Sequence, residues 1–471
     1  MNSNNESSRI YVLIAATLAV FVTPFMGSSL NIALPSIGAE FEMDAVLLGW
    51  INLAFLMASS TFLVPFGRIA DIYGRKRIFT IGILVFTLSS VLCAVSTSGT
   101  MLIAARIVQG IGGSMIFGTS VAILTSVFPV GQRGVALGIN VAAVYLGLSL
   151  GPPIGGLMTQ YLGWRSIFIV NVVLGFAVFI LVLWRLKGEW AAARGEKFDF
   201  WGSLIYGVMI ITTMYGFSLL PELSAAWLIL VGVAALVAFV WWELRVQSPV
   251  LHIDLFRRNV VFAFSNLAAL INYSATFAIG FLLSIYLQMV KGFPPQIAGL
   301  ILIAQPVVMA VVSPVAGRLS DRIEPRVLAS AGMGITAVGL AFFIFLDGQT
   351  SMVFLIAGLV IVGLGLAIFS SPNTNAVMSS VDYRFLGVAS ATLATMRQIG
   401  MMLSMGIVMM LLALFIGRVQ ITPEYHDLYV KAMRVAFIVF AVACFGGIFA
   451  SLARGNVRNN DVIAVPQESN D

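Results

Sequence analysis

Two arginines stand inside long apolar stretches, where a charged side chain has the clearest potential for chemistry. Arg106 belongs to the sequence RIVQG and Arg397 to the sequence MRQIG. A charge within a membrane is costly, so such a side chain normally faces a protein interior or a water-filled cavity. We expect Arg106, Gln109 and Arg397 to line a solute cavity, where arginines favour anionic or neutral solutes. The alternative is a structural role, in which each arginine donates to backbone carbonyls of neighbouring helices.

Residues for enzymatic or metal chemistry are few and widely separated. Cys93 and Cys444 form no C-x-x-C motif, and His252 and His426 have no partners at metal-ligand spacing. No G-K-[ST] sequence occurs, which argues against a phosphate-binding P-loop. No grouping of nucleophile, base and orienting residue is found either. We therefore predict that the protein is not an enzyme and that it has no metal site and no cofactor.

The composition predicts the elements that hold these arginines. Of the 471 residues, 60% are hydrophobic and 10% are charged, whereas soluble domains have about 45–50% apolar and about 25% charged residues. Stretches long enough to cross a bilayer must be helical, because lipid offers the backbone no hydrogen-bond partners. We predict an all-α membrane protein with fourteen transmembrane helices, near residues 10–32, 46–66, 78–97, 101–123, 134–157, 166–184, 201–219, 226–242, 262–287, 297–316, 327–346, 352–371, 388–416 and 430–452.

The distribution of positive charge predicts the orientation of the chain. Most of the 26 Lys and Arg residues fall in alternate loops, which the positive-inside rule assigns to the cytoplasm. Both termini are then cytoplasmic, as an even number of spans requires. The net charge of +6 is a topology signal rather than a nucleic-acid footprint. We expect a multi-pass protein of the cell membrane, surrounded by the lipid bilayer and without a nucleic-acid partner.

A short sequence recurs in the two parts of the chain. GRIAD at 67–71 is matched by GRLSD at 317–321, which indicates duplicated halves. Parallel repeats with a site at their interface are a design of secondary transporters. We predict an N-terminal six-helix half at 1–186, a two-helix insert with cytoplasmic linkers at 187–258, a C-terminal six-helix half at 259–454 and a cytoplasmic tail at 455–471.

The loop after the second predicted span, GRIADIYGRKR at 67–77, resembles the helix 2 to 3 signature of the major facilitator superfamily, G-x-L-x-D-R-x-G-R-[RK]-x. Ile69 and Ile72 replace its Leu and Arg. Glycines permit the tight turn, and an aspartate can accept hydrogen bonds from the arginines. The resemblance implies a latch between the halves on the cytoplasmic side. A role as topology anchors alone would explain neither the aspartate nor the glycines. The implied latch residues are Gly67, Arg68, Asp71, Gly74, Arg75 and Asp321.

The fifth predicted span resembles the antiporter signature G-x-x-x-G-P-x-x-G-G of the superfamily's fourteen-helix drug:proton antiporter branch. Its glycines allow close helix contact and its proline makes the helix bendable, although generic helix packing is an alternative. The resemblance implies the major facilitator fold, with two six-helix halves and two inserted helices. It also implies secondary active efflux of small hydrophobic or amphiphilic compounds, with the proton as partner. The motif residues are Gly147, Gly151, Pro152, Gly155 and Gly156.

One position departs from the pattern of this branch. Members commonly carry an aspartate in the first span, in L-D-x-T-x-x-N-x-A-L-P, that handles protons or cations, and Met26 stands in its place. None of the 20 acidic residues is expected in the middle of a span, so any titration falls to the latch, Asp71 included, or to the membrane edges. Two alternatives stay open: an exporter of neutral or anionic metabolites without this coupling, and a transporter-like sensor that moves no solute.

Polar residues on otherwise apolar spans are candidates to bind a small-molecule substrate. The proline-interrupted sequence SSPNTN at 370–375 suits a water-filled cavity best. Hydrogen bonding between helices is the alternative role for such residues. The candidates are Asn31, Asn272, Tyr273, Gln305, Asn373 and Asn375. The sequence contains no signal for a particular oligomeric state.

Overall fold

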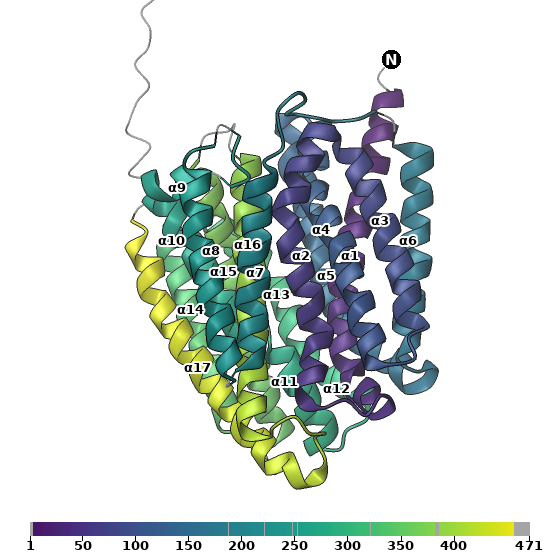
Figure 1. Ribbon diagram of the computed structural model, residues 1–471, viewed down its shortest axis with the longest axis vertical. Helices are drawn as coiled ribbons and strands as arrows, with labels where there is room; N and C mark the ends of the chain where they lie inside the picture. The colour runs from purple at the N-terminus through teal and green to yellow at the C-terminus, as the bar shows by residue number, and fades with distance from the viewer. Residues whose placement is uncertain are drawn as a thin grey trace, which may run out of the picture.

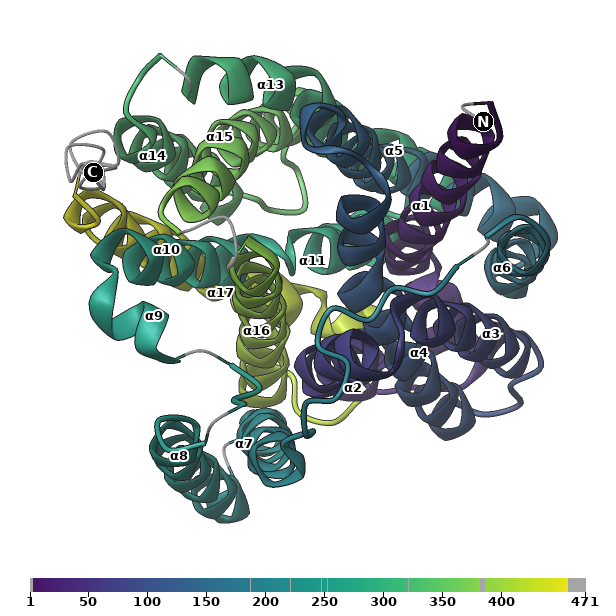
Figure 2. The same cartoon turned by 90° about the horizontal axis from the view of Figure 1, so that it is seen from above.

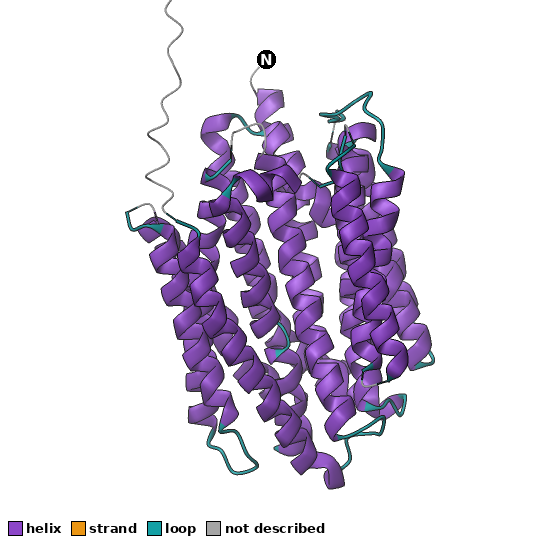
Figure 3. Cartoon of the chain, turned by 60° about the vertical axis from the view of Figure 1, so that its left-hand side comes forward, coloured by secondary structure: helices purple, strands orange, loops and turns teal. Residues whose placement is uncertain are grey.

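The computed structural model describes residues 3–186, 188–220, 222–246, 248–251, 253–320, 322–381 and 386–455. Within these ranges the chain is helical and contains no strand (Figure 3). Fourteen helical segments are long and apolar enough to cross a membrane. This result confirms the predicted all-α membrane fold with fourteen spans.

The first six spans form one side of the molecule (Figures 1 and 2). Side-chain caps set where two of them begin. Asp44 Oδ1 accepts hydrogen bonds from the backbone N–H groups of Val46 and Leu47, both at 2.8 Å, and Ser98 Oγ accepts one from Met101 at 3.2 Å. The six helices are α1 (Ser3–Glu40), α2 (Ala45–Tyr73), α3 (Arg75–Ala94), α4 (Gly99–Val127), α5 (Val130–Leu162) and α6 (Arg165–Arg185).

The last six spans form the opposite side, and two of them are divided into shorter helices (Figure 2). The ninth span comprises α10 (Val260–Thr276), α11 (Ile279–Ile285) and the π-helix η1 (Tyr286–Val290), and the tenth comprises α12 (Pro295–Leu302) and α13 (Ala304–Ser320). The remaining elements are α14 (Pro325–Ile344), α15 (Met352–Ser379), α16 (Leu386–Phe415), the 3₁₀ turn η3 (Pro423–Tyr425) and α17 (His426–Ala453).

These two interruptions differ from the continuous spans predicted at 262–287 and 297–316. Pro306 has no N–H to donate, and the helix breaks just before it, at Ile303. At the other break, the backbone N–H of Ala278 donates to Ser404 Oγ on α16 at 3.1 Å. A neighbouring helix thus supplies the partner that lipid cannot. Hydropathy does not predict such breaks, because it measures only how apolar a stretch is.

The inserted helices α7 (Phe200–Leu219) and α8 (Leu223–Glu243) form a hairpin at the edge of the bundle (Figure 2). α7 packs against α2 of the first half and α16 of the second. The Tyr206 hydroxyl donates to the Ser60 carbonyl of α2 at 3.1 Å. α8 lies farther out, with most of its apolar surface exposed and thus available to lipid. The short helix α9 (Ile253–Arg258) then leads to the second half.

Each half contains a pair of helices whose backbones touch through a glycine. A Cβ on Gly112 of α4 would lie 2.6 Å from the backbone nitrogen of Phe86 on α3. A Cβ on Gly365 of α15 would lie 2.5 Å from the backbone nitrogen of Thr336 on α14. α3 with α4 and α14 with α15 are the third and fourth spans of their halves. The same close crossing therefore occurs in both halves, and only glycine leaves room for it.

We expect Gly112→Ala and Gly365→Ala each to lower the free energy of unfolding by about 1–3 kcal/mol, because the added methyl group forces two helix backbones apart. Gly27→Ala is the matched control, since a Cβ there meets nothing within 4 Å. Thermal unfolding of the purified protein in detergent measures the effect. A control variant destabilised as much as the other two would contradict this account of the crossings.

Candidate functional site

The two halves meet closely on the side away from the N-terminus. Ser284 Oγ of α11 donates to the carbonyl of Asn31 on α1 at 2.6 Å, and Gln288 Nε2 donates to the next carbonyl, that of Ile32, at 2.9 Å. These two hydrogen bonds join the halves on that side of the bundle.

The helix 5 motif packs α5 against α1. Gly147, Gly151 and Gly155 are four residues apart and lie on one face of the helix. A Cβ on Gly147 would lie 2.7 Å from the Phe21 carbonyl of α1. Ser29 Oγ of α1 donates to the Gly151 carbonyl at 2.9 Å. Small residues at this spacing let two helix backbones touch along several turns.

Another part of the same motif packs α5 against the second half. A Cβ on Gly156 would lie 2.5 Å from the Pro295 carbonyl of α12, and a Cβ on Gly299 of α12 would collide with the Pro152 carbonyl of α5. α5 is therefore in backbone contact with a helix of each half. A bulky residue on the face toward α12 would push the two halves apart.

The signature loop between α2 and α3 is bonded within the first half. Gly74 has a φ of 123°, a value that side chains rarely allow, and it joins the two helices. Arg75 Nε donates to Asp71 Oδ1 at 2.7 Å, and the Arg75 guanidinium also donates to Ser126 Oγ of α4 at 2.6 Å. The Asp71–Arg75 pair thus ties α2 and α3 to α4. Asp321, the expected counterpart, lies outside the described residues.

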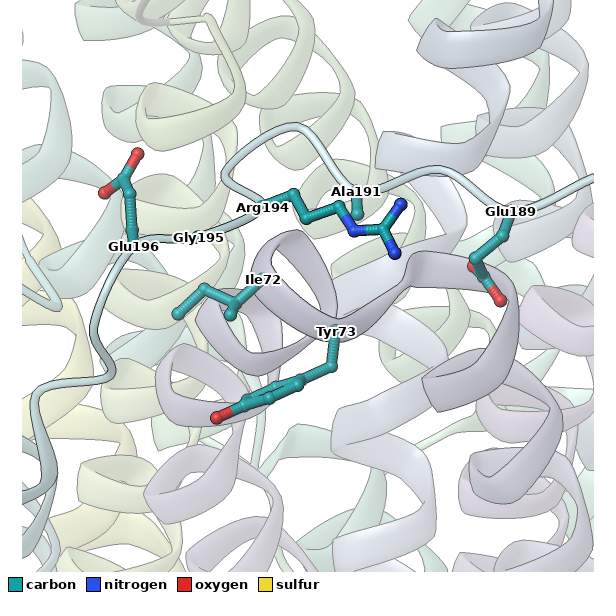
Figure 4. Close-up of a pocket in the computed structure, with 7 residues that line it drawn as sticks. All are labelled: Ile72, Tyr73, Glu189, Ala191, Arg194, Gly195 and Glu196. Carbon is teal, nitrogen blue, oxygen red and sulfur yellow. The ribbon is translucent and has the colours of Figure 1, made fainter.

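Residues 188–198, the linker that leads to α7, lie across this loop. The backbone N–H of Ala193 donates to the Asp71 carbonyl at 2.9 Å, and Arg68 forms an ion pair with Glu196. A recess of about 560 Å³ lies between the linker and the end of α2. Sequence reasoning did not assign the linker any contact with the latch. The residues that line the recess are Ile72, Tyr73, Glu189, Ala191, Arg194, Gly195 and Glu196 (Figure 4).

Arg106 is buried in the first half, with 1% of its surface exposed. Its Nε donates to the Ile51 carbonyl of α2 at 3.0 Å, and its guanidinium donates to Gln109 Oε1 at 2.6 Å. The guanidinium carbon also lies 4.3 Å from the centre of the Phe55 ring. None of the described acidic side chains pairs with it. In this conformation Arg106 ties helices together.

Met26, which replaces the expected aspartate, lies beside the Arg106 network and is fully buried. Gln109 Nε2 is 3.1 Å from Met26 Sδ and donates to Ser90 Oγ at 2.7 Å. An acidic side chain at this position would lie next to the glutamine that Arg106 contacts. The thioether instead leaves the buried guanidinium among neutral groups.

Arg397 has a different environment on α16, where its side chain is partly exposed. Its guanidinium donates to Thr374 Oγ1 at 2.6 Å and lies 5.5 Å from the centre of the Tyr273 ring. Within the described residues, Arg397 Nε has no hydrogen-bond partner. The next residue, Gln398, accepts a hydrogen bond from Ser60 Oγ of α2 at 2.9 Å. Arg397 is therefore bonded within its own half, next to a residue that contacts the first half, and its unpartnered Nε is buried.

The expected cavity residues fall into two groups. Asn272 and Asn373 are fully buried, and Asn373 Nδ2 donates to the Ser265 carbonyl at 3.1 Å. In this conformation these two asparagines contribute to helix packing. The partly exposed candidates are Asn31, Tyr273, Gln305 and Asn375.

Sequence reasoning missed a second buried arginine. Arg454, just after α17, is 1% exposed and donates to Asn373 Oδ1 at 3.0 Å and to Ser265 Oγ at 3.2 Å. The last predicted span ends at residue 452, so the sequence places Arg454 just outside it, among the basic residues of the cytoplasmic side. Nothing in the sequence distinguishes it from the basic residues of other loops. Asp199 and Glu243, at the ends of the insert helices, are also buried.

We expect Arg106→Met to lower the melting temperature more than Arg397→Met does. The first change removes two buried hydrogen bonds from the guanidinium, to the Ile51 carbonyl and to Gln109 Oε1, at a cost of about 1.5–3 kcal/mol for each. The second change removes a hydrogen bond at a partly exposed site. Thermal unfolding in detergent compares the two variants. Equal losses would contradict the structural role of Arg106.

Comparison with known proteins places these features in a family. The family model described as the Major Facilitator Superfamily matches residues 16–405. The chain is 30% identical over 444 residues to the riboflavin transporter RibZ of Clostridioides difficile, covering 94% of this chain and 96% of that protein. It is 29% identical to the multidrug resistance protein Stp of Mycobacterium tuberculosis (strain CDC 1551 / Oshkosh), covering 98% and 87%. It is 30% identical to the cephamycin export protein CmcT of Amycolatopsis lactamdurans, covering 96% and 95%.

A solved structure supports the same fold. A bacterial homologue of the human lysosomal transporter Spinster, in an inward-facing and unoccupied conformation, matches with a TM-score of 0.65. The sequences are 18% identical, and the match covers 95% of this chain and 97% of the other. This likeness concerns the fold alone, whereas the family match extends over most of the sequence. The chain belongs to the Major Facilitator Superfamily and is a multi-pass membrane transporter rather than an enzyme.

Proposed function

We propose that this protein exports small hydrophobic or amphiphilic compounds across the cell membrane and uses the proton gradient to do so. The observation that carries the proposal is the helix 5 motif, which brings α5 into backbone contact with α1 and α12. A helix that touches both halves through small residues can transmit relative motion between them. Relatives named as multidrug resistance and cephamycin export proteins support the direction of transport.

The arrangement of the halves supports alternating access. Contacts such as those of Ser284 and Gln288 with α1 close the side away from the N-terminus. With the N-terminus in the cytoplasm, as the charge distribution predicts, this is an inward-facing state. In the opposite state the halves would approach each other near the Gly67–Arg77 loop. The latch would then have to release some contacts with the linker, such as the Arg68–Glu196 ion pair.

The identity of the solute is linked to Arg397. Its partly exposed guanidinium and the adjacent Tyr273 ring offer a positive charge beside an aromatic face. An anionic or neutral aromatic compound can bind both groups, whereas a permanent cation is repelled. This observation favours neutral or anionic amphiphiles as a second candidate class. The relative named as a riboflavin transporter is compatible with such a class.

Transport in proteoliposomes tests the energy source. With a pH gradient imposed, we expect a fluorescent amphiphile to move against its own gradient, and a protonophore to abolish that movement. Protein-free liposomes are the control. Movement that follows only sodium or voltage would contradict proton coupling. Binding without any movement under all three gradients would instead indicate a non-transporting sensor.

A charge-removing variant tests the role of Arg397. Arg397→Met should reduce transport of an anionic amphiphile by about tenfold, equivalent to about 1.4 kcal/mol. Transport of a neutral analogue should change little, and Arg397→Lys should restore part of the anion transport. Arg418→Met, which removes an exposed arginine at the edge of the bundle, is the matched control. Equal loss for both solutes would show that Arg397 has a structural role instead.

A further inference from the structure

Two acidic side chains are buried together where α7 begins and α8 ends. Asp199 is 8% exposed and Glu243 is 4% exposed, whereas the other described acidic side chains are partly or fully exposed. A Cβ on Gly202 would lie 2.7 Å from Glu243 Oε1 and would also collide with Asp199 Oδ2. The two carboxyl oxygens therefore occupy the same small space above Gly202.

The two carboxyl groups have unequal surroundings. Asp199 lies at the N-terminal end of α7, where the helix dipole favours a negative charge, and it accepts hydrogen bonds from Gly202 N–H at 2.9 Å and from Trp242 Nε1 at 3.1 Å. Glu243 is the last residue of α8, where the dipole disfavours a negative charge. Its Oε2 accepts from the Leu251 N–H at 3.0 Å, but its buried Oε1 has no partner. The surroundings of Asp199 thus stabilise a negative charge better than those of Glu243 do.

Among the described residues, no cation neutralises this pair. Neither carboxyl group forms an ion pair within the described part of the chain. On the α2 side, Arg68 is already paired with Glu196, and Arg245 lies over the Trp241 ring at 3.9 Å. His252 lies outside the described residues. The other charged residues of the adjoining segments are exposed and are Arg194, Lys197, Asp254, Arg257 and Arg258.

We propose that Asp199 and Glu243 form a proton-binding site that holds one proton at neutral pH, carried by Glu243. Adjacent carboxyl groups out of water cannot both ionise cheaply. The proton supplies the missing hydrogen at Glu243 Oε1 and leaves a single negative charge in the buried space. Its loss places two negative charges between the ends of α7 and α8. Because α7 packs against both α2 and α16, this site lies on an element that contacts both halves of the transporter.

Infrared difference spectroscopy of the full-length protein in lipid nanodiscs tests the site without a transport assay. At neutral pH we expect the stretching band of a protonated carboxyl group that shifts on exchange into D₂O and is lost at alkaline pH. The band should be absent from Glu243→Gln and present in Glu222→Gln. The second variant is the matched control, because Glu222 is an exposed glutamate at the other end of α8. The result is independent of the proposed export activity, since no solute takes part.

A second readout uses the indole that donates to Asp199. The tryptophan emission of the wild type should change over the pH interval in which the carboxyl band is lost, and Trp242→Phe should abolish that change. The wild-type measurements decide the question even where a variant fails to fold. Absence of the band from the wild type at neutral pH would overturn the proposal, and so would its persistence in Glu243→Gln.

Discussion

Lipid offers the peptide backbone no hydrogen-bond partner, and the rest of this structure depends on that constraint. It makes every span a helix, and it allows a helix to break only where another part of the protein supplies the missing partner. The break between α10 and α11 illustrates the rule, because Ser404 accepts from the Ala278 N–H. With all spans helical, two helix backbones can touch only where small residues lie between them. Glycines accordingly mark the closest crossings, including those of α5 with α1 and α12.

The lipid environment also determines where charged side chains can lie. Arg106 and Arg454 are fully buried and donate to neutral acceptors of their own half. Arg397 keeps part of its surface exposed and has one nitrogen without a partner. The two buried arginines join helices, whereas we propose that the partly exposed Arg397 contacts the solute. Arg106 and Arg397 both lie in apolar stretches of the sequence, yet their environments in the structure differ.

The proposed proton site is far from the first-span position where an acidic residue was expected. The first span resembles a motif that has an aspartate where this chain has Met26, and none of the described acidic residues lies in the middle of a span. The insert contains the buried pair Asp199 and Glu243 instead. This pair and the latch are both on the side of the N-terminus, and the linker connects them. A proton that affects the insert would therefore act close to the segment that covers Asp71.

The sequence by itself determined the number of spans, their helical nature, the duplicated motifs and the presence of two arginines within predicted spans, because these depend on composition and on spacing along the chain. It could not determine where a helix breaks under tertiary support, that Asn373 is buried against Arg454, or that Asp199 meets Glu243. Those contacts join residues far apart in the chain. Hydropathy and motif spacing contain no information about which faces of two helices come together, so only the packed structure decided them.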